Sequence, residues 1–276
     1  NGVEDADISA IKNSQRRLRN QFLPQSLLSH CGFEQAFDYH YLRIMRIAVH
    51  PQLQQQGIGT FFITQIETLA REQGVDVVGT SFGANASLLS FWLKAGFSTT
   101  RIGFTKDKSS GEHSALLIKG INVNAQKTQQ LLEKDFYRSF DYLLLEEYKT
   151  LNSELVRLLL VQQSSEYLTK LSTLDIANVL AFSQGERLYS SCSYSLYLWL
   201  KHDLLINSAC VDSHMEKNIF ILIARLIQKH DSKTVCQQYD LTGKKSRNQV
   251  MQADVRQKIT NETTHTNIIN GPLTVF

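Results

Sequence analysis

A glycine turn at residues 54–60 is the segment whose residue types could do chemistry. It reads Gln54-Gln55-Gln56-Gly57-Ile58-Gly59-Thr60 and lies between a predicted strand and a predicted helix. At such a junction unpaired backbone N–H groups and the positive end of the helix dipole converge, which favours a phosphate-bearing ligand. Gly57 would let the backbone approach a phosphate closely, and Gly59 would permit tight packing in the first helical turn. The turn therefore predicts a diphosphate site, although two glycines alone are a weak signal.

The elements around the turn make this signal more specific. Residues 43–49 are rich in β-branched side chains and end at His50-Pro51, which predicts a strand closed by a turn. Residues 60–73 have the apolar spacing of a helix. The pattern then predicts a strand at 75–80, a helix at 85–96 capped by Asn85, and strands at 97–104 and 114–121.

The regions on either side of this block are predicted to be helical. Residues 8–30 have one apolar helical side, with Pro24 marking a helix start or a kink. Beyond residue 122, Leu recurs at three- and four-residue spacing, and helices are predicted at 174–184, 193–202 and 215–228. We therefore predict two domains, 1–122 and 123–276.

The order of strand, Gln-x-x-Gly-x-Gly turn, helix, strand and Asn-led helix resembles that of the GCN5-related N-acetyltransferases. The resemblance implies an α+β fold of that type, and the residues before the strand at Ile44 are too few for the early strands of a complete domain. It also implies acetyl-coenzyme A as the cofactor. Backbone groups of Ile47, Ala48 and Val49 would hold the acetyl and pantetheine end, and the turn 54–60 would hold the pyrophosphate. Ser87 and Lys94 would face the cofactor, with Ser87 standing where an acidic residue is expected.

Three further segments narrow the resemblance. They are Arg46-Ile47-Ala48-Val49-His50-Pro51, Ser81-Phe82-Gly83 and Ser109-Ser110-Gly111, and together they resemble the bacterial tRNA(Met) cytidine acetyltransferases. That family implies acetylation of N4 of the wobble cytidine in elongator tRNA(Met), a helical tRNA-binding tail at 123–276, and a preceding helicase-type ATPase. Because this sequence contains no Gly-x-x-x-x-Gly-Lys-Ser/Thr loop, ATP is expected only in a domain outside it, without which the chain could be inactive.

The catalytic groups are not evident from the sequence. Cytosine N4 is a poor nucleophile, so the enzyme must align it with the thioester and stabilise a developing oxyanion, for which the Val49 N–H is suitable. We assign no catalytic base, because the amine is neutral and water could relay its proton. His50 is interpreted as a turn residue.

Basic residues form clusters although the net charge is only +3. Residues 1–122 hold 12 Lys and Arg against 10 Asp and Glu, and residues 123–276 hold 17 against 16, so neither half is a basic tail. The candidate RNA-binding residues are Arg16, Arg17, Arg19, Lys244, Lys245 and Arg247, with Lys106 and Lys108 as a third cluster. Each cluster alone is more often ordinary solvated surface.

The remaining composition bounds the class of protein. No stretch approaches the roughly 20 apolar residues of a membrane helix, and the opening residues lack the blocks of a signal peptide. The four cysteines form no CxxC pair, so we expect neither a metal site nor a disulfide framework. We therefore expect reduced thiols in a cytoplasmic protein. The sequence does not determine the oligomeric state.

Two other functions fit the same residues. One is an acetyltransferase that acts on a protein or a small amine, with the helical tail as an oligomerisation or interaction surface. The other is a noncatalytic module that binds acyl-coenzyme A, which the absence of an evident catalytic base supports. Transfer of label from acetyl-coenzyme A to RNA would favour tRNA acetylation over both of these alternatives.

Overall fold

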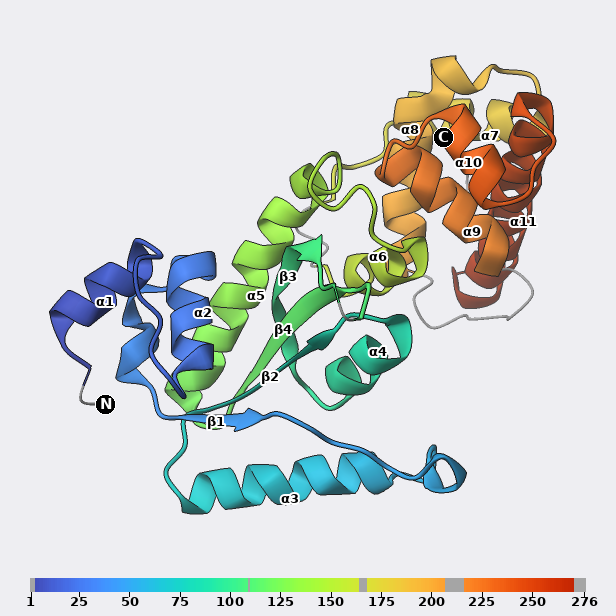
Figure 1. Cartoon of the computed structure of the whole chain (residues 1–276). Helices are drawn as coiled ribbons and strands as arrows, with labels where there is room; N and C mark the ends of the chain where they lie inside the picture. Colours follow the sequence, from blue (N-terminus) through green and yellow to red (C-terminus); the bar gives the residue numbers. More distant parts are fainter. Residues whose placement is uncertain (1–2, 109, 164–167, 207–215, 271–276) are drawn as a thin grey trace. The chain divides into compact units, whose positions relative to one another are not determined.

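The computed structural model of this protein describes residues 3–108, 110–163, 168–206 and 216–270, with residues 206, 216, 217 and 261–270 as backbone only (Figure 1). The chain divides into two compact units, Asn1–Phe140 and Asp141–Phe276. The first unit combines a β-sheet with helices, and the second consists of helices. In the part of the chain that the structure describes, no helix is both long and apolar enough to cross a membrane.

A four-stranded sheet forms the centre of the first unit. Its strands are β1 (Tyr41–Ile44), β2 (Val77–Gly83), β3 (Ser98–Lys106) and β4 (His113–Gly120). Their order across the sheet is β1-β2-β4-β3, in which β1 and β2 are parallel and the other neighbours are antiparallel. A parallel pair needs a crossover connection, and helix α3 (Ile58–Glu72) provides it. Strand β1 therefore lies at an edge of the sheet.

Helices cover both faces of this sheet. Successive residues of a strand point to opposite faces. Ile118 shares a buried core with α1 (Asp5–Lys12), α2 (Phe22–Cys31) and α5 (Val123–Leu143). The adjacent Lys119 points the other way, where its Nζ lies 2.5 Å from Oε1 of Glu67 on α3 and 2.7 Å from the Ala95 carbonyl oxygen, just after α4 (Ala86–Lys94). The sheet thus has an α1, α2 and α5 face and an α3 and α4 face.

Most predicted elements of the first unit are confirmed, with shifted ends. Two predictions were wrong. The strand predicted at 43–49 ends at Ile44, after which the chain leaves the sheet. The helical pattern predicted over 8–30, with Pro24 as a helix start or a kink, is not continuous: the chain leaves the helix between Lys12 and Phe22, because it turns through left-handed conformations at Ser14 and Asn20, with φ of 58° and 62°. A right-handed helix cannot pass through such residues.

The division between the units also differs from the predicted boundary near residue 122. Helix α5 begins at Val123, yet Ala125 and Leu132 are buried in the core that α1 and α2 form against the sheet. The helix therefore packs as part of the first unit, which extends to Phe140. Leucine spacing identified the helix correctly, but spacing does not reveal which neighbour buries its apolar side.

The second unit is built from helices around its own apolar core. Side-chain caps fix several starts: Ser172 and Asp175 form a capping box, and Asn152 and Asp231 accept from backbone N–H groups. Gln228 is buried and bonds the carbonyl oxygens of Lys149 and Leu151. The helices are α6 (Ser153–Leu160), α7 (Thr173–Gln184), α8 (Tyr189–Ile206), α9 (Glu216–Leu222), a π-helical turn (Ile223–Ile227), α10 (Ser232–Gln238) and α11 (Lys244–Asn270).

Candidate functional site

Strands β1 and β2 separate at one end of their pairing. They are in register from Tyr41 with Val77 to Ile44 with Thr80, and β2 then continues to Gly83 with β4 as its partner. After Ile44 the chain runs away from β2 toward the turn that precedes α3, as Figure 1 shows. Among the described residues, the backbone N–H groups of residues 47–49 have no hydrogen-bond acceptor. Exposed donors of this kind must be satisfied by water or by a ligand.

The glycine turn before α3 presents a second set of unengaged amides. Gly57 has φ +80°, and Gln55 also adopts a positive φ of 61°. No described residue accepts a hydrogen bond from the backbone N–H groups of residues 55–60, and the first such bond of the helix runs from Phe61 to the Gly57 carbonyl oxygen (2.9 Å). The turn is largely exposed and lies at the positive end of a 15-residue helix. This arrangement attracts an anion.

The two glycines of the turn have different roles. A Cβ added at Gly57 would meet nothing within 4 Å, so its backbone is open to a ligand, whereas its positive φ disfavours other residues. A Cβ added at Gly59 would lie 3.0 Å from Cε2 of Phe91 and 3.9 Å from Cγ2 of Val49. Gly59 therefore allows the start of α3 to pack closely against α4 and the segment after β1, as predicted.

Side chains hold the turn in place. Gln54 Nε2 donates to the Val49 carbonyl oxygen (3.0 Å), and Gln56 Nε2 donates to the Gln52 carbonyl oxygen (3.1 Å). His50 Nδ1 accepts from the Gln52 N–H (3.4 Å) and caps a short 3₁₀ helix, Pro51–Leu53. These bonds tie residues 49–56 together before any ligand binds. They also agree with the interpretation of His50 as a turn residue.

Helix α4 contributes a residue to the turn that the sequence did not identify. The Phe91 ring of this helix is only half-buried and lies against the Gly59 position. Only the spatial approach of two helices, 32 positions apart in sequence, reveals this pairing. Ser87 and Lys94 are exposed on the same helix, and no described hydrogen bond or ion pair holds either side chain. Both remain candidates for cofactor contact.

Two of the segments that resemble the tRNA(Met) cytidine acetyltransferases, Ser81-Phe82-Gly83 and Ser109-Ser110-Gly111, lie close together in space. A Cβ added at Gly83, the last residue of β2, would lie 3.3 Å from Oγ of Ser110 and 3.5 Å from Cβ of Glu112. Ser109 lies outside the described residues. The Ser81-Phe82-Gly83 segment and the Ser110-Gly111 part of the loop therefore lie side by side at the end of β2, where it has lost β1 as a partner.

One candidate RNA-binding residue is misassigned. Arg247 is only 1% exposed. It lies one helical turn before Met251 and two before Val255, which are fully buried, so it belongs to the inner side of α11. Its guanidinium carbon lies 5.3 Å from the centroid of the Tyr189 ring, and burial together with the charge of Arg225 lowers the pKa of Arg247. A buried side chain cannot meet RNA.

The other candidate cations are exposed and belong to different units. Arg16, Arg17 and Arg19 lie in the loop between α1 and α2, and Lys244 and Lys245 begin α11 in the second unit. Arg16 forms an ion pair with Asp7. Among the described residues, no group of three or more His, Cys, Asp or Glu side chains could hold a metal ion. Cys31, Cys192 and Cys236 are free thiols, and Cys210 lies outside the described residues.

Comparison with known proteins finds a matching family model and several similar proteins. Residues 63–122 match the family model described as GNAT acetyltransferase 2. A tRNA(Met) cytidine acetyltransferase of Nitrosococcus halophilus is 29% identical over 256 residues, which are 92% of this chain and 34% of that protein. The enzyme of the same name from Vibrio cholerae is 27% identical over 250 residues, 90% of this chain and 33% of that protein. That of Haemophilus influenzae is 35% identical over 139 residues, 50% of this chain and 21% of that protein.

The chain therefore spans about a third of the length of the Nitrosococcus halophilus and Vibrio cholerae relatives. The sheet order, the parallel β1 and β2 pair and the glycine turn before α3 agree with the predicted fold. The first unit has a fold of the GCN5-related N-acetyltransferase type, and a helical unit follows it. This chain carries a GNAT acetyltransferase domain and is similar over most of its length to the tRNA(Met) cytidine acetyltransferases.

Proposed function

We propose that this chain transfers the acetyl group of acetyl-coenzyme A to N4 of the wobble cytidine in elongator tRNA(Met). The names of its relatives support a tRNA acceptor, and the matched domain supports an acetyl donor. One observation carries the proposal. The amides of residues 47–49 and 55–60 have no acceptor among the described residues, and they lie on consecutive segments joined by the short turn 50–54.

The residues present fit the coenzyme. Its diphosphate needs several N–H donors and close backbone approach, and the exposed turn around Gly57 offers both. Its pantetheine arm contains amides that require donors and acceptors, for which the separated edge of β1 is suited. In this proposal residues 54–60 hold the diphosphate, and Ile47, Ala48 and Val49 hold the acetyl end. Ser87 and Lys94 on α4 border the cofactor.

The chemistry asks little of acidic or basic side chains. The bound coenzyme supplies an acetyl group activated as a thioester. Cytosine N4 is a weak nucleophile, so the chain acts mainly by aligning the two reactants and by stabilising negative charge on the acetyl oxygen. The Val49 N–H, which has no acceptor among the described residues, is the donor assigned to that oxygen. The amine is already neutral, and water can accept its proton.

The second unit serves to hold RNA in this proposal. Lys244 and Lys245 are exposed at the start of α11, where the helix N-terminus also favours phosphate. Binding through such groups should weaken steeply as salt is raised. In this proposal the transfer reaction takes place in the cytoplasm.

Labelled acetyl-coenzyme A tests the proposal. The chain is incubated with bulk tRNA, with peptides and with polyamines in parallel, and the label is followed. Label in cytidine of tRNA is expected. Label only in peptides or polyamines would assign the chain to other acceptors, and coenzyme binding measured by calorimetry without transfer to any acceptor would favour a noncatalytic module. Failure to bind the coenzyme at all would remove the basis of the proposal.

A further inference from the structure

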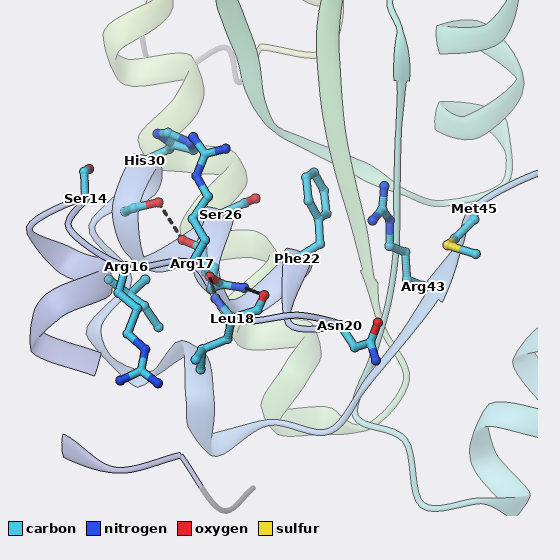
Figure 2. A pocket seen from close by; sticks show the side chains of 13 residues that line it. Ser14, Arg16, Arg17, Leu18, Asn20, Phe22, Ser26, His30, Arg43 and Met45 are labelled. Atoms are coloured by element: carbon cyan, nitrogen blue, oxygen red, sulfur yellow. Dashed lines mark hydrogen bonds between the residues drawn. The ribbon is translucent and has the colours of Figure 1, made fainter. Parts of the chain in front are cut away.

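A cationic pocket lies on the α2 face of the sheet, apart from the glycine turn. Its volume is about 510 Å³, which is within the range of about 300–1,000 Å³ typical of small-molecule sites. The loop between α1 and α2 contributes Arg16 and Arg17, α2 contributes Phe22 and His30, and β1 contributes Arg43. Figure 2 shows Arg17 reaching toward His30 and Phe22 lying beside Arg43.

The charge of this pocket is one-sided. None of the described residues that line it is an Asp or a Glu. Arg16 is paired with Asp7, which lies outside the lining, whereas Arg17 has no partner among the described residues. Burial and the charges of Arg101 and Arg17 lower the pKa of His30, which disfavours its charged form. The ligand that fits such a lining is an anion.

The loop that carries the two arginines is fixed in place. Gln25 of α2 accepts from the Leu18 N–H (2.7 Å) and donates to the Leu18 carbonyl oxygen (2.8 Å) and the Gln21 carbonyl oxygen (2.8 Å). Ser14 and Asn20, on either side, adopt left-handed conformations that cost free energy in residues other than glycine. Strained backbone held by such bonds is typical of a preorganised binding loop.

The pocket also offers a stacking surface. The guanidinium carbon of Arg43 lies 3.8 Å from the centroid of the Phe22 ring, and Phe22 is 38% exposed. Single-stranded nucleic acids are commonly held by arginine planes and aromatic rings on which bases stack, together with cations that contact the phosphates. The combination of the unpaired Arg17 and an exposed stack selects a nucleotide over a bare inorganic anion.

The pocket adjoins the proposed acetyl site from the opposite face of the sheet. Arg43 is in register with Gly79, and a Cβ added at Gly79 would lie 2.8 Å from Leu23 of α2, so Arg43 points to the α2 face. The glycine turn leads into α3 on the other face. Met45, which also lines the pocket, follows the last residue of β1, where β1 leaves β2. The pocket therefore extends to the point where β1 leaves β2.

We propose that this pocket binds an unpaired nucleotide of the RNA substrate, with its phosphate on Arg17 and Arg16 and its base stacked on the Arg43 and Phe22 pair. The inference rests on the proposed function and adds the site where single-stranded RNA enters. It requires the base to be unpaired, since a stacked and paired base presents neither of its faces.

Binding of a fluorescently labelled anticodon stem-loop RNA to the whole chain, measured by anisotropy, tests the pocket. Arg17→Ala should weaken binding by about 10-fold and lower the salt dependence by about one counterion, as expected for one lost phosphate contact. Arg43→Lys keeps the charge but removes the planar stacking group, so it should weaken binding by about 5- to 10-fold with an unchanged salt dependence. Arg71→Ala, an exposed arginine on α3, is the matched control and should bind RNA normally.

The outcomes separate the pocket from the function on which it rests. Calorimetric affinity for acetyl-coenzyme A should be unchanged in all three variants. If the wild-type chain binds RNA and the two pocket variants bind it as well as Arg71→Ala does, the pocket proposal is wrong while the RNA function stands. If a duplex of the same sequence competes as well as the single strand, the unpaired nucleotide is excluded. A wild-type chain that binds the coenzyme but no RNA overturns both proposals.

Discussion

Replacement of Gly57 by Glu is the most direct test of the glycine turn. A Glu side chain meets no protein atom near its Cβ, so the change does not clash with the fold, but it places a carboxylate where the diphosphate is proposed to bind. The left-handed backbone adds a conformational cost of about 1–2 kcal/mol in any residue with a side chain. Two effects are therefore expected, one on stability and one on binding.

The loss of binding can be estimated from the charges. Two unit charges about 4 Å apart repel each other by about 1 kcal/mol in bulk water and by about 4 kcal/mol at the effective dielectric constant of a protein surface. At about 1.4 kcal/mol for each factor of ten, the Kd for acetyl-coenzyme A should rise by between about 5-fold and about 1,000-fold. Because the turn is exposed, part of the loss should be recovered at high salt.

Gly74→Glu provides a matched control at the opposite end of α3. Gly74 also has a positive φ, of 66°, and a Cβ there also meets nothing within 4 Å. Both variants should lose similar stability in urea unfolding, and only Gly57→Glu should lose coenzyme affinity by calorimetry. Equal affinities of Gly57→Glu and the wild type, or an equal loss in Gly74→Glu, would refute the placement of the diphosphate at the turn.

Two further predictions concern packing and a buried charge. Gly59→Val should destabilise the chain by about 1–3 kcal/mol in urea unfolding, since a Cβ at this position would lie 3.0 Å from Phe91. In the double variant, Phe91→Ala should offset part of that loss of stability. If the losses of the two single variants simply add in the double variant, the contact between Gly59 and Phe91 is contradicted. Burial and the nearby Asp203 raise the pKa of Asp254 from 3.8 to about 6, and Lys258 opposes this shift. The folded state therefore binds the Asp254 proton more tightly than the unfolded state does. As the pH rises from 4 to 6, the ionising Asp254 carboxylate increasingly destabilises the folded state. At 1.36 kcal/mol per pKa unit, this shift corresponds to about 3 kcal/mol of stability. Asp254→Asn should therefore stabilise the chain by up to that amount above pH 6 and hardly at all below pH 4. A gain in stability that does not depend on pH would exclude the Asp254 carboxylate as its cause.

Local features of the first unit were predictable because short-range interactions set them. The spacing of apolar residues identified the helices at 58–72 and 86–94, and Asn85 caps the latter through the Leu88 N–H. The glycine turn could be located because left-handed backbone at Gly57 and bare amides at a helix start depend on neighbouring residues alone. The role of residues 47–49 and 54–60 in holding a coenzyme remains a prediction, as does the cofactor contact of Ser87 and Lys94.

Features that depend on which surfaces meet could not be read from the sequence. Arg247 looked like part of a basic cluster with Lys244 and Lys245, but the side of α11 that faces inward is set by the packing of the second unit. The same holds for α5, which the sequence assigned to the tail and which packs on the sheet of the first unit.

What the sequence by itself determined about this protein is the order of its elements and the glycine turn, since each depends on residues close together in the chain. The tertiary structure decided where β1 separates from β2 and that Phe91 lies against Gly59. It also decided that Arg16 and Arg17, in the loop between α1 and α2, line one pocket with Arg43. Such contacts join residues tens of positions apart, and their formation depends on the cooperative packing of helices against both faces of the sheet, which no local pattern encodes.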